Sequence, residues 1–232
     1  MEHEEFLKME WFESWFDSPY YHILYQNRDI QEAEGFVRAL TQKLNIPKAS
    51  SMMDLACGKG RYAKLLAEYG AEVVGLDLSE ESIKYAKQFE NERLSFYKHD
   101  MRQLFRINYF DYIFNLFTSF GYFKTDREHL RVFKNIEKGL RPGGTFIFDY
   151  FNLASVKANL VSEEVIERGG YTFEINRSIE NEQVIKRIKV IQGSETKTYT
   201  EQVRAFDGSA FEEMLQQAGL QIVAKFGNYQ LD

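Results

Sequence analysis

The sequence contains a single cysteine, Cys57. One cysteine excludes an intrachain disulfide bond and a thiolate-rich metal cluster. No run of about 18 apolar residues occurs, so the sequence predicts no membrane-spanning helix. The start, Met1–Glu5, lacks the basic and apolar pattern of a secretory signal. We therefore expect a cytoplasmic protein without a membrane partner.

An excess of positive charge is also missing, since the formal net charge is -6 and Lys and Arg are scattered along the chain. Proteins that bind nucleic acids commonly carry a basic surface that contacts phosphates. We therefore expect no nucleic-acid partner. The apolar share of 44% is that of an ordinary globular protein, and 232 residues suffice for one substantial core.

Aromatic residues are abundant, with 20 Phe and 14 Tyr, and they concentrate in residues 6–25 and 105–123. Aromatic side chains at this density can simply fill a core. They can equally form the walls of a pocket for an organic substrate. The sequence leaves both interpretations open.

The middle of the chain alternates short apolar strands with amphipathic helices. Helices are predicted over 59–69, 79–89 and 126–140, and strands over 51–55, 72–77, 94–98, 109–116 and 145–150. This alternation predicts an α/β fold with a mostly parallel central sheet flanked by helices. Such sheets bind ligands at the carboxyl ends of their strands.

The flanking segments depart from this alternation. Two helices are expected near the start, one over about 6–16 that ends at Asp17-Ser18-Pro19 and one over 30–44. Residues 163–206 show period-two patterns that predict an insert of three or four antiparallel strands after the fifth parallel strand. A helix over 209–218 and a strand over 220–226 follow.

A glycine-containing turn joins the first strand to the next helix. Gly58 and Gly60 allow a ligand to approach backbone N–H groups at a helix start. With Ala63, they fit the degenerate nucleotide-binding fingerprint. A tight turn without a ligand remains the alternative, and Cys57 within it is expected to be a packing residue.

Carboxylates at three neighbouring strand ends make the prediction more specific. Asp77 can accept hydrogen bonds from ribose hydroxyls, and Asp100 with Met101 is placed to contact an adenine edge, or else to cap a helix. Asp54 discriminates between cofactors, because its charge repels a pyrophosphate but tolerates a ligand with an ammonium and a cationic sulfur. S-adenosylmethionine fits this description and NAD does not.

Four segments resemble the motifs of class I S-adenosylmethionine-dependent methyltransferases, and together they cover about residues 50–150. They are Met53–Gly60, Leu76–Ser79, Asp100–Arg102 and Leu140–Gly144. The resemblance implies a Rossmann-like fold. Ala56 departs from the commonest pattern, which has glycine there, and we expect the turn to tolerate the extra methyl group.

The resemblance also implies roles for individual residues. The methionine part of the cofactor would contact the first turn, through Asp54, Ala56, Cys57, Gly58 and Gly60. The ribose would contact Asp77 and Leu78 of the second motif, and the adenine would contact Asp100 and Met101 of the third. The sulfonium would lie near Phe117, after the fourth strand, and the cofactor carboxylate would contact Tyr25 and Arg28 of the N-terminal segment.

The segment Asn115–Tyr122 lacks the Pro-Pro pair that follows the fourth strand in nucleic-acid methyltransferases of this fold. We therefore expect a small-molecule methyl acceptor. The segment and the insert are similar to small-molecule N-methyltransferases, including those acting on amino sugars, although nitrogen, oxygen and carbon acceptors all remain open. Candidate acceptor contacts are Tyr20, Tyr21, Tyr122 and Asp149. We place His129 on a solvated helix face, and we assign no catalytic base and no metal site.

The resulting expectation is a single domain, with an N-terminal helical lid (1–47), a cofactor-binding core (48–150), inserted strands that cover the substrate (151–207) and a C-terminal helix and strand (208–232). The final strand of the family is missing, which leaves a gap beside the strand at 220–226. We also expect a homodimer through the inserted strands. A non-catalytic adenosylmethionine-binding module and a nicotinamide-dependent oxidoreductase are the alternatives.

Overall fold

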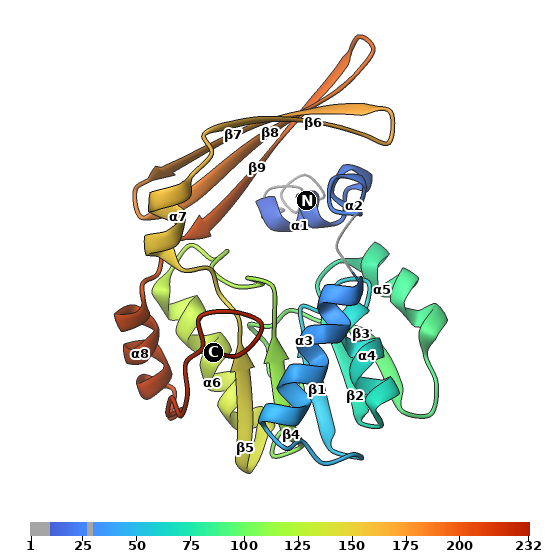
Figure 1. Ribbon diagram of the computed structural model, residues 1–232, viewed down its shortest axis with the longest axis vertical. Coiled ribbons are helices and arrows are strands. Elements are labelled where there is room, and N and C mark those ends of the chain that lie inside the picture. Colours follow the sequence, from blue (N-terminus) through green and yellow to red (C-terminus); the bar gives the residue numbers. More distant parts are fainter. Residues whose placement is uncertain (1–9, 27–29) are drawn as a thin grey trace, which may run out of the picture. The chain divides into compact units, whose positions relative to one another are not determined.

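The computed structural model describes residues 10–26 and 30–232 (Figure 1). They form two compact units. Of the described residues, one unit combines 10–26 with Phe151–Asp207, and the other combines 30–150 with Gly208–Asp232. The segment 1–47, predicted as one lid, is therefore divided between the two units.

The larger unit is built around a five-stranded parallel sheet in the order β3-β2-β1-β4-β5. The strands are β1 (Ser51–Leu55), β2 (Glu72–Asp77), β3 (Leu94–Lys98), β4 (Phe110–Asn115) and β5 (Leu140–Phe148). The helices are α3 (Ile30–Lys43), α4 (Arg61–Tyr69), α5 (Glu80–Ala86), α6 (Asp126–Gly139) and α8 (Gly208–Gln217). The strand order reverses between β1 and β4. The predicted α/β fold, with a mostly parallel central sheet flanked by helices, is confirmed.

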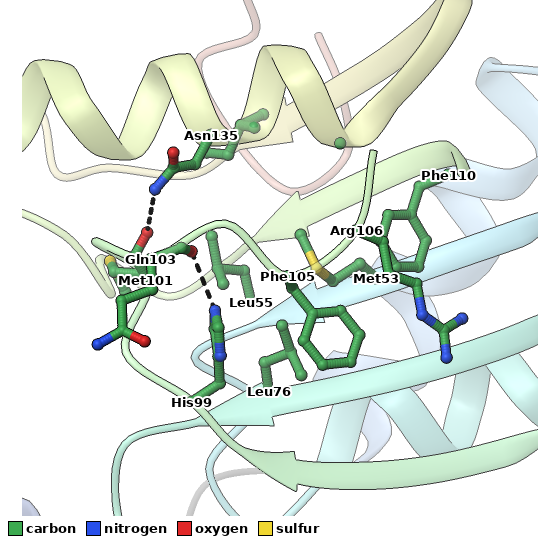
Figure 2. Close-up of a pocket in the computed structure, with 12 residues that line it drawn as sticks. Met53, Leu55, Leu76, His99, Met101, Gln103, Phe105, Arg106, Phe110 and Asn135 are labelled. Atoms are coloured by element: carbon green, nitrogen blue, oxygen red, sulfur yellow. Dashed lines mark hydrogen bonds between the residues drawn. The ribbon is translucent and has the colours of Figure 1, made fainter. Parts of the chain in front are cut away.

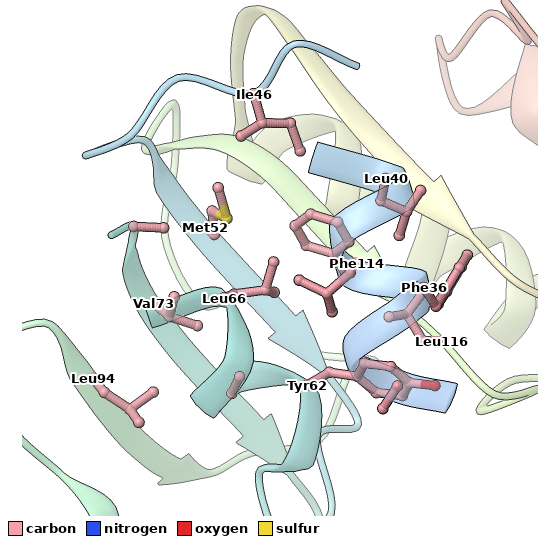
Figure 3. Close-up of a cluster of buried hydrophobic side chains, with 14 of the residues drawn as sticks. Phe36, Leu40, Ile46, Met52, Tyr62, Leu66, Val73, Leu94, Phe114 and Leu116 are labelled. Atoms are coloured by element: carbon pink, nitrogen blue, oxygen red, sulfur yellow. The ribbon is translucent and has the colours of Figure 1, made fainter. Parts of the chain in front are cut away.

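Helices cover both faces of this sheet, which is why every residue of β1 is buried. On one face, Phe36 of α3 and Leu66 of α4 pack with Phe114 of β4 (Figure 3). On the other, Phe133 of α6 stacks on Phe120 with ring centroids 4.7 Å apart. The sheet thus presents only its strand ends to ligands.

The predicted strand over 220–226 is wrong. In residues 218–232 the structure has no strand, and the sheet ends at β5. A strand needs a neighbour for its backbone hydrogen bonds. No described strand pairs with this segment, and Val223 is 84% exposed. The predicted gap disappears with the strand. Instead, the chain after α8 runs to the face covered by α3, where Leu231 is buried.

The smaller unit is a four-stranded antiparallel sheet with three short helices, which confirms the predicted insert. It contains α1 (Trp11–Phe16), α2 (Pro19–Leu24), α7 (Leu153–Asn159), β6 (Glu163–Arg168), β7 (Tyr171–Glu180), β8 (Gln183–Gln192) and β9 (Glu195–Arg204). Trp15 and Leu24 pack on Phe173 and Ile188. Asp17-Ser18-Pro19 separates two helices, because Ser18 caps α2 and Pro19 occupies its first turn.

Candidate functional site

The turn between β1 and α4 forms with three residues in the left-handed region of backbone space. Ala56 has φ 62°, Gly58 54° and Gly60 79°. The N–H of Cys57 donates to the Leu76 carbonyl of β2 at 3.0 Å, which anchors the turn to the neighbouring strand. The expected tolerance of Ala56 is seen, although a non-glycine residue in this region carries a conformational cost.

The two glycines of this turn serve different purposes. A Cβ atom on Gly60 would lie 2.6 Å from the Phe96 ring, so packing and positive φ both require glycine there. A Cβ atom on Gly58 would meet nothing within 4 Å. Close approach of a ligand to the backbone is therefore possible at Gly58, whereas Gly60 supports the core beneath the turn.

Asp54 at the end of β1 is only 2% exposed. Burial raises its pKa to about 7, while the backbone N–H of Ala63 and the charge of Arg61 act in the opposite direction. Its Oδ2 atom has no hydrogen-bond partner among the described residues. A buried carboxylate oxygen without a donor favours a ligand that brings one, and a cationic donor best of all.

Asp77 at the end of β2 holds the glycine turn in place. One carboxylate oxygen accepts from the N–H of Gly58 at 2.7 Å, and the other accepts from the N–H of Ser79 at 2.8 Å. Leu78 lies between these contacts and is half-buried. A carboxylate oxygen can accept hydrogen bonds from more than one donor, hydroxyl groups included.

Asp100, after β3, is engaged by a residue that the sequence analysis did not single out. The Arg102 guanidinium donates to both carboxylate oxygens of Asp100 and also pairs with Glu128 of α6 at 3.0 Å. Burial raises the pKa of Asp100, but hydrogen bonds from Arg102 outweigh this and hold that pKa below its ordinary value. The spacing Asp100-x-Arg102 in the sequence could have predicted this ion pair.

A small cavity lies under the segment that follows Asp100 (Figure 2). Its volume of about 10 Å³ corresponds to a single water molecule. Met53, Leu55 and Leu76 contribute apolar walls. Asn135 of α6 donates to the Met101 carbonyl at 3.3 Å at its rim. The cavity is far too small for a nucleoside, so Met101 can contact an adenine only from another side.

The turn after β4 is strained in the same sense as the glycine turn. Phe117 and Thr118 are consecutive non-glycine residues with φ 63° and 56°. Asp149, just after β5, holds both: its Oδ2 accepts the Phe117 N–H at 2.7 Å, and its carbonyl accepts the Thr118 N–H at 3.2 Å. The Arg61 guanidinium lies 5.5 Å from the centre of the Phe117 ring. The start of α4 therefore lies next to the turn after β4.

The remaining predicted residues fall in several places. Tyr122 donates its hydroxyl to the Thr118 carbonyl at 2.8 Å. In the smaller unit, Tyr25 donates to Glu201 at 2.9 Å. Tyr20 packs on Tyr171 and Tyr21 on Trp15 in that same unit, and Arg28 lies outside the described residues. Roles for these residues toward a cofactor or acceptor stay predictions.

The expectation for His129 is wrong, because the side chain is fully buried (0% exposed). Its ring nitrogens lie 3.0 Å from the Thr125 carbonyl and 3.3 Å from the Phe123 N–H. The arginines beside it in sequence suggested a polar helix face, but the apolar stripe of α6 includes position 129. Burial raises the pKa of the Cys57 thiol well above its ordinary value, which agrees with the expected packing role.

No group of metal-ligating side chains occurs among the residues that the structure describes. Within the same residues, no helix has the length and apolar character needed to cross a membrane.

Residues 46–219 match the family model of a methyltransferase domain. The chain belongs to this methyltransferase family. It is 30% identical over 188 residues to the putative methyltransferase YqeM of Bacillus subtilis. The aligned residues cover 77% of this chain and 76% of that protein. It is 29% identical over 127 residues to the dTDP-3-amino-3,4,6-trideoxy-alpha-D-glucopyranose N,N-dimethyltransferase of Streptomyces venezuelae, covering 54% and 53% of the two chains.

Solved structures agree on the fold of this methyltransferase. An S-adenosylmethionine-dependent methyltransferase from Clostridium acetobutylicum superposes with a TM-score of 0.74 at 22% identity, covering 90% of this chain and 88% of that one. DesVI of Streptomyces venezuelae gives 0.68 at 24% identity, with 90% and 92% covered. The prediction of a class I, S-adenosylmethionine-dependent methyltransferase is confirmed. These comparisons support neither the non-catalytic nor the nicotinamide-dependent alternative.

Proposed function

We propose that this methyltransferase transfers the methyl group of S-adenosylmethionine to an amino nitrogen of a small molecule, with an amino sugar as the favoured acceptor class. The observation that carries the proposal is the buried Asp54 carboxylate, whose unpartnered oxygen lies beneath a turn with an open position at Gly58. The acceptor class is supported by three similar proteins named as N,N-dimethyltransferases of dTDP-linked amino sugars.

The charges of the site match the ends of the cofactor. Asp54 offers negative charge for the ammonium group, and the Arg61 guanidinium at the start of α4 offers positive charge for the carboxylate. Asp77, whose carboxylate accepts the N–H groups of Gly58 and Ser79, would also accept hydrogen bonds from the ribose hydroxyls. Asp100 and Met101 would contact the adenine.

When bound, S-adenosylmethionine supplies a methyl group that is already activated on a cationic sulfur. The chain therefore needs to orient the cofactor and exclude water, and it needs no covalent nucleophile. The Phe117 ring would support the sulfonium through its negative face. Asp149 would hold that ring in place through the Phe117 N–H.

Several finer assignments complete the proposal. Tyr25 and Arg28 would contact the cofactor carboxylate, and Tyr20, Tyr21 and Tyr122 would contact the acceptor. A cytoplasmic location and a homodimer through the inserted strands also remain predictions.

The cofactor site is tested by calorimetric titration of the protein with S-adenosylmethionine. We expect submillimolar binding that Asp77→Ala abolishes. Asp111→Ala is a matched control. Asp111 also accepts a backbone N–H, that of Ser51 at 2.8 Å, but at the start of β1 and so at the opposite end of the strand from the glycine turn. This control should bind normally. A wild-type protein that binds no S-adenosylmethionine would refute the proposal.

The acceptor class is tested with methyl-labelled S-adenosylmethionine and a set of dTDP-amino sugars, with matched hydroxyl sugars as controls. Mass spectrometry should locate the label on the amino nitrogen. Labelling of the hydroxyl sugars alone would overturn the assignment to nitrogen while leaving the methyltransferase assignment intact.

A further inference from the structure

We propose that Tyr229, in the chain after α8, is a positioning residue for methyl transfer. Its hydroxyl fixes the Asp149 carboxylate, and that carboxylate fixes the backbone of Phe117. The inference rests on the proposed function, because it takes Phe117 to be the residue beside the sulfonium.

The first step of the argument is the conformation that must be held. Phe117 and Thr118 both have positive φ, which non-glycine residues adopt only when their surroundings enforce it. Asp149 accepts two of the backbone hydrogen bonds that hold these residues, and the Tyr122 hydroxyl donates a further one to the Thr118 carbonyl. The rotamer of the Asp149 carboxylate therefore helps to set the position of the Phe117 backbone, and with it that of the ring.

The second step is what fixes that rotamer. The Tyr229 hydroxyl donates to Asp149 Oδ2 at 3.0 Å, the same atom that accepts the Phe117 N–H at 2.7 Å. Burial and the neighbouring Asp149 carboxylate raise the pKa of Tyr229 well above its ordinary value. The hydroxyl thus keeps its proton and remains a donor at every physiological pH.

The third step is that Tyr229 is itself held rigidly. Its ring lies 4.5 Å from that of Phe36 on α3, and Leu231 is buried two residues later. The chain after α8, although it forms no strand, thus delivers a hydroxyl to the end of β5. Residues 80 positions apart are joined at the site where the methyl group would be transferred.

Tyr229→Phe tests this directly, because it keeps the ring against Phe36 and removes only the hydroxyl. We expect the Phe117 amide to exchange with solvent about tenfold faster, as for loss of one hydrogen bond to a charged group. The affinity for S-adenosylmethionine should fall by a similar factor. Tyr69→Phe is the matched control: it removes the hydroxyl that bonds the Ile46 carbonyl at 2.6 Å, and it should change neither quantity.

A second comparison separates positioning from general weakening of the fold. If Tyr229 acts through Asp149, then Tyr229→Phe should have no further effect in an Asp149→Ala background, which leaves no side-chain acceptor for the Tyr229 hydroxyl. Unchanged exchange at Phe117 in Tyr229→Phe would overturn the inference, as would additive effects in the double variant. If the wild type binds no cofactor, the proposed function fails and the positioning role fails with it, whereas cofactor binding with unchanged exchange refutes this inference alone.

Discussion

Asp54 should make the ligand-free protein less stable at neutral pH, and Asp54→Asn should reverse this. The carboxyl is buried, its pKa is raised from 3.8 to about 7, and one of its oxygens lacks a donor within the described chain. Asparagine has nearly the same shape, carries no charge and can still accept the hydrogen bond from Ala63.

The magnitude follows from the difference in proton binding between the folded and unfolded states. Between about pH 4 and pH 7 the folded protein keeps a proton that the unfolded chain has released, so stability falls as pH rises across this window. The shift of about three pKa units corresponds to about 4 kcal/mol in total. Of this, about 3 kcal/mol is lost between about pH 5 and pH 8.

The assay is urea unfolding of the wild type and Asp54→Asn at both pH values. The gain in the free energy of unfolding from the substitution should be about 3 kcal/mol larger at the higher pH. Asp111→Asn is the control, because it removes a partner of Arg141 on the surface and should give no such gain. An Asp54→Asn gain that is the same at both pH values would show that the carboxyl titrates normally.

Three further predictions concern the same turn. S-adenosylmethionine should bind about tenfold more tightly at about pH 8 than at about pH 6, because its cationic groups favour ionised Asp54. Calorimetry in two buffers of different ionisation enthalpy should detect the proton released on binding, and Asp54→Asn should remove the pH dependence of the affinity. Ala56→Gly should raise the free energy of unfolding by about 1 kcal/mol by relieving left-handed strain, and a lower melting temperature would contradict this. Gly60→Ala should lower the free energy of unfolding by about 2 kcal/mol or more, because its Cβ would meet Phe96. Gly58→Ala should lower the free energy of unfolding less but should weaken cofactor binding. Equal losses in the free energy of unfolding for the two variants would refute the distinction between the glycines.

The parallel core could be predicted because its signals are local. Apolar strands, helix caps and the glycine turn each occupy a few consecutive residues, and Asp54 and Asp77 were found from their places at strand ends. Residues that act through distant contacts left no such signal. Tyr229 reaches Asp149 across 80 positions, and nothing in the sequence around it indicates this.

Other errors arose where one local pattern permits two structures. Ser18-Pro19 can end a helix or begin one, and only packing on the antiparallel sheet decides for the second. Likewise, the apolar pattern over 220–226 predicts a strand, but a strand also needs a neighbour. Whether a partner exists is a property of the whole sheet and not of the segment.

The smaller unit has a consequence for biosynthesis. Its core combines helices from the start of the chain with strands from near the end, and the indole N–H of Trp15 bonds to Glu201, 186 residues away. A ribosome must therefore have made most of the chain before Trp15 can find its partners. All five strands of the parallel sheet emerge during that interval and can already pair with one another. The apolar surfaces of α1 and α2 wait longer, because β7 and β8, which cover them, are made later.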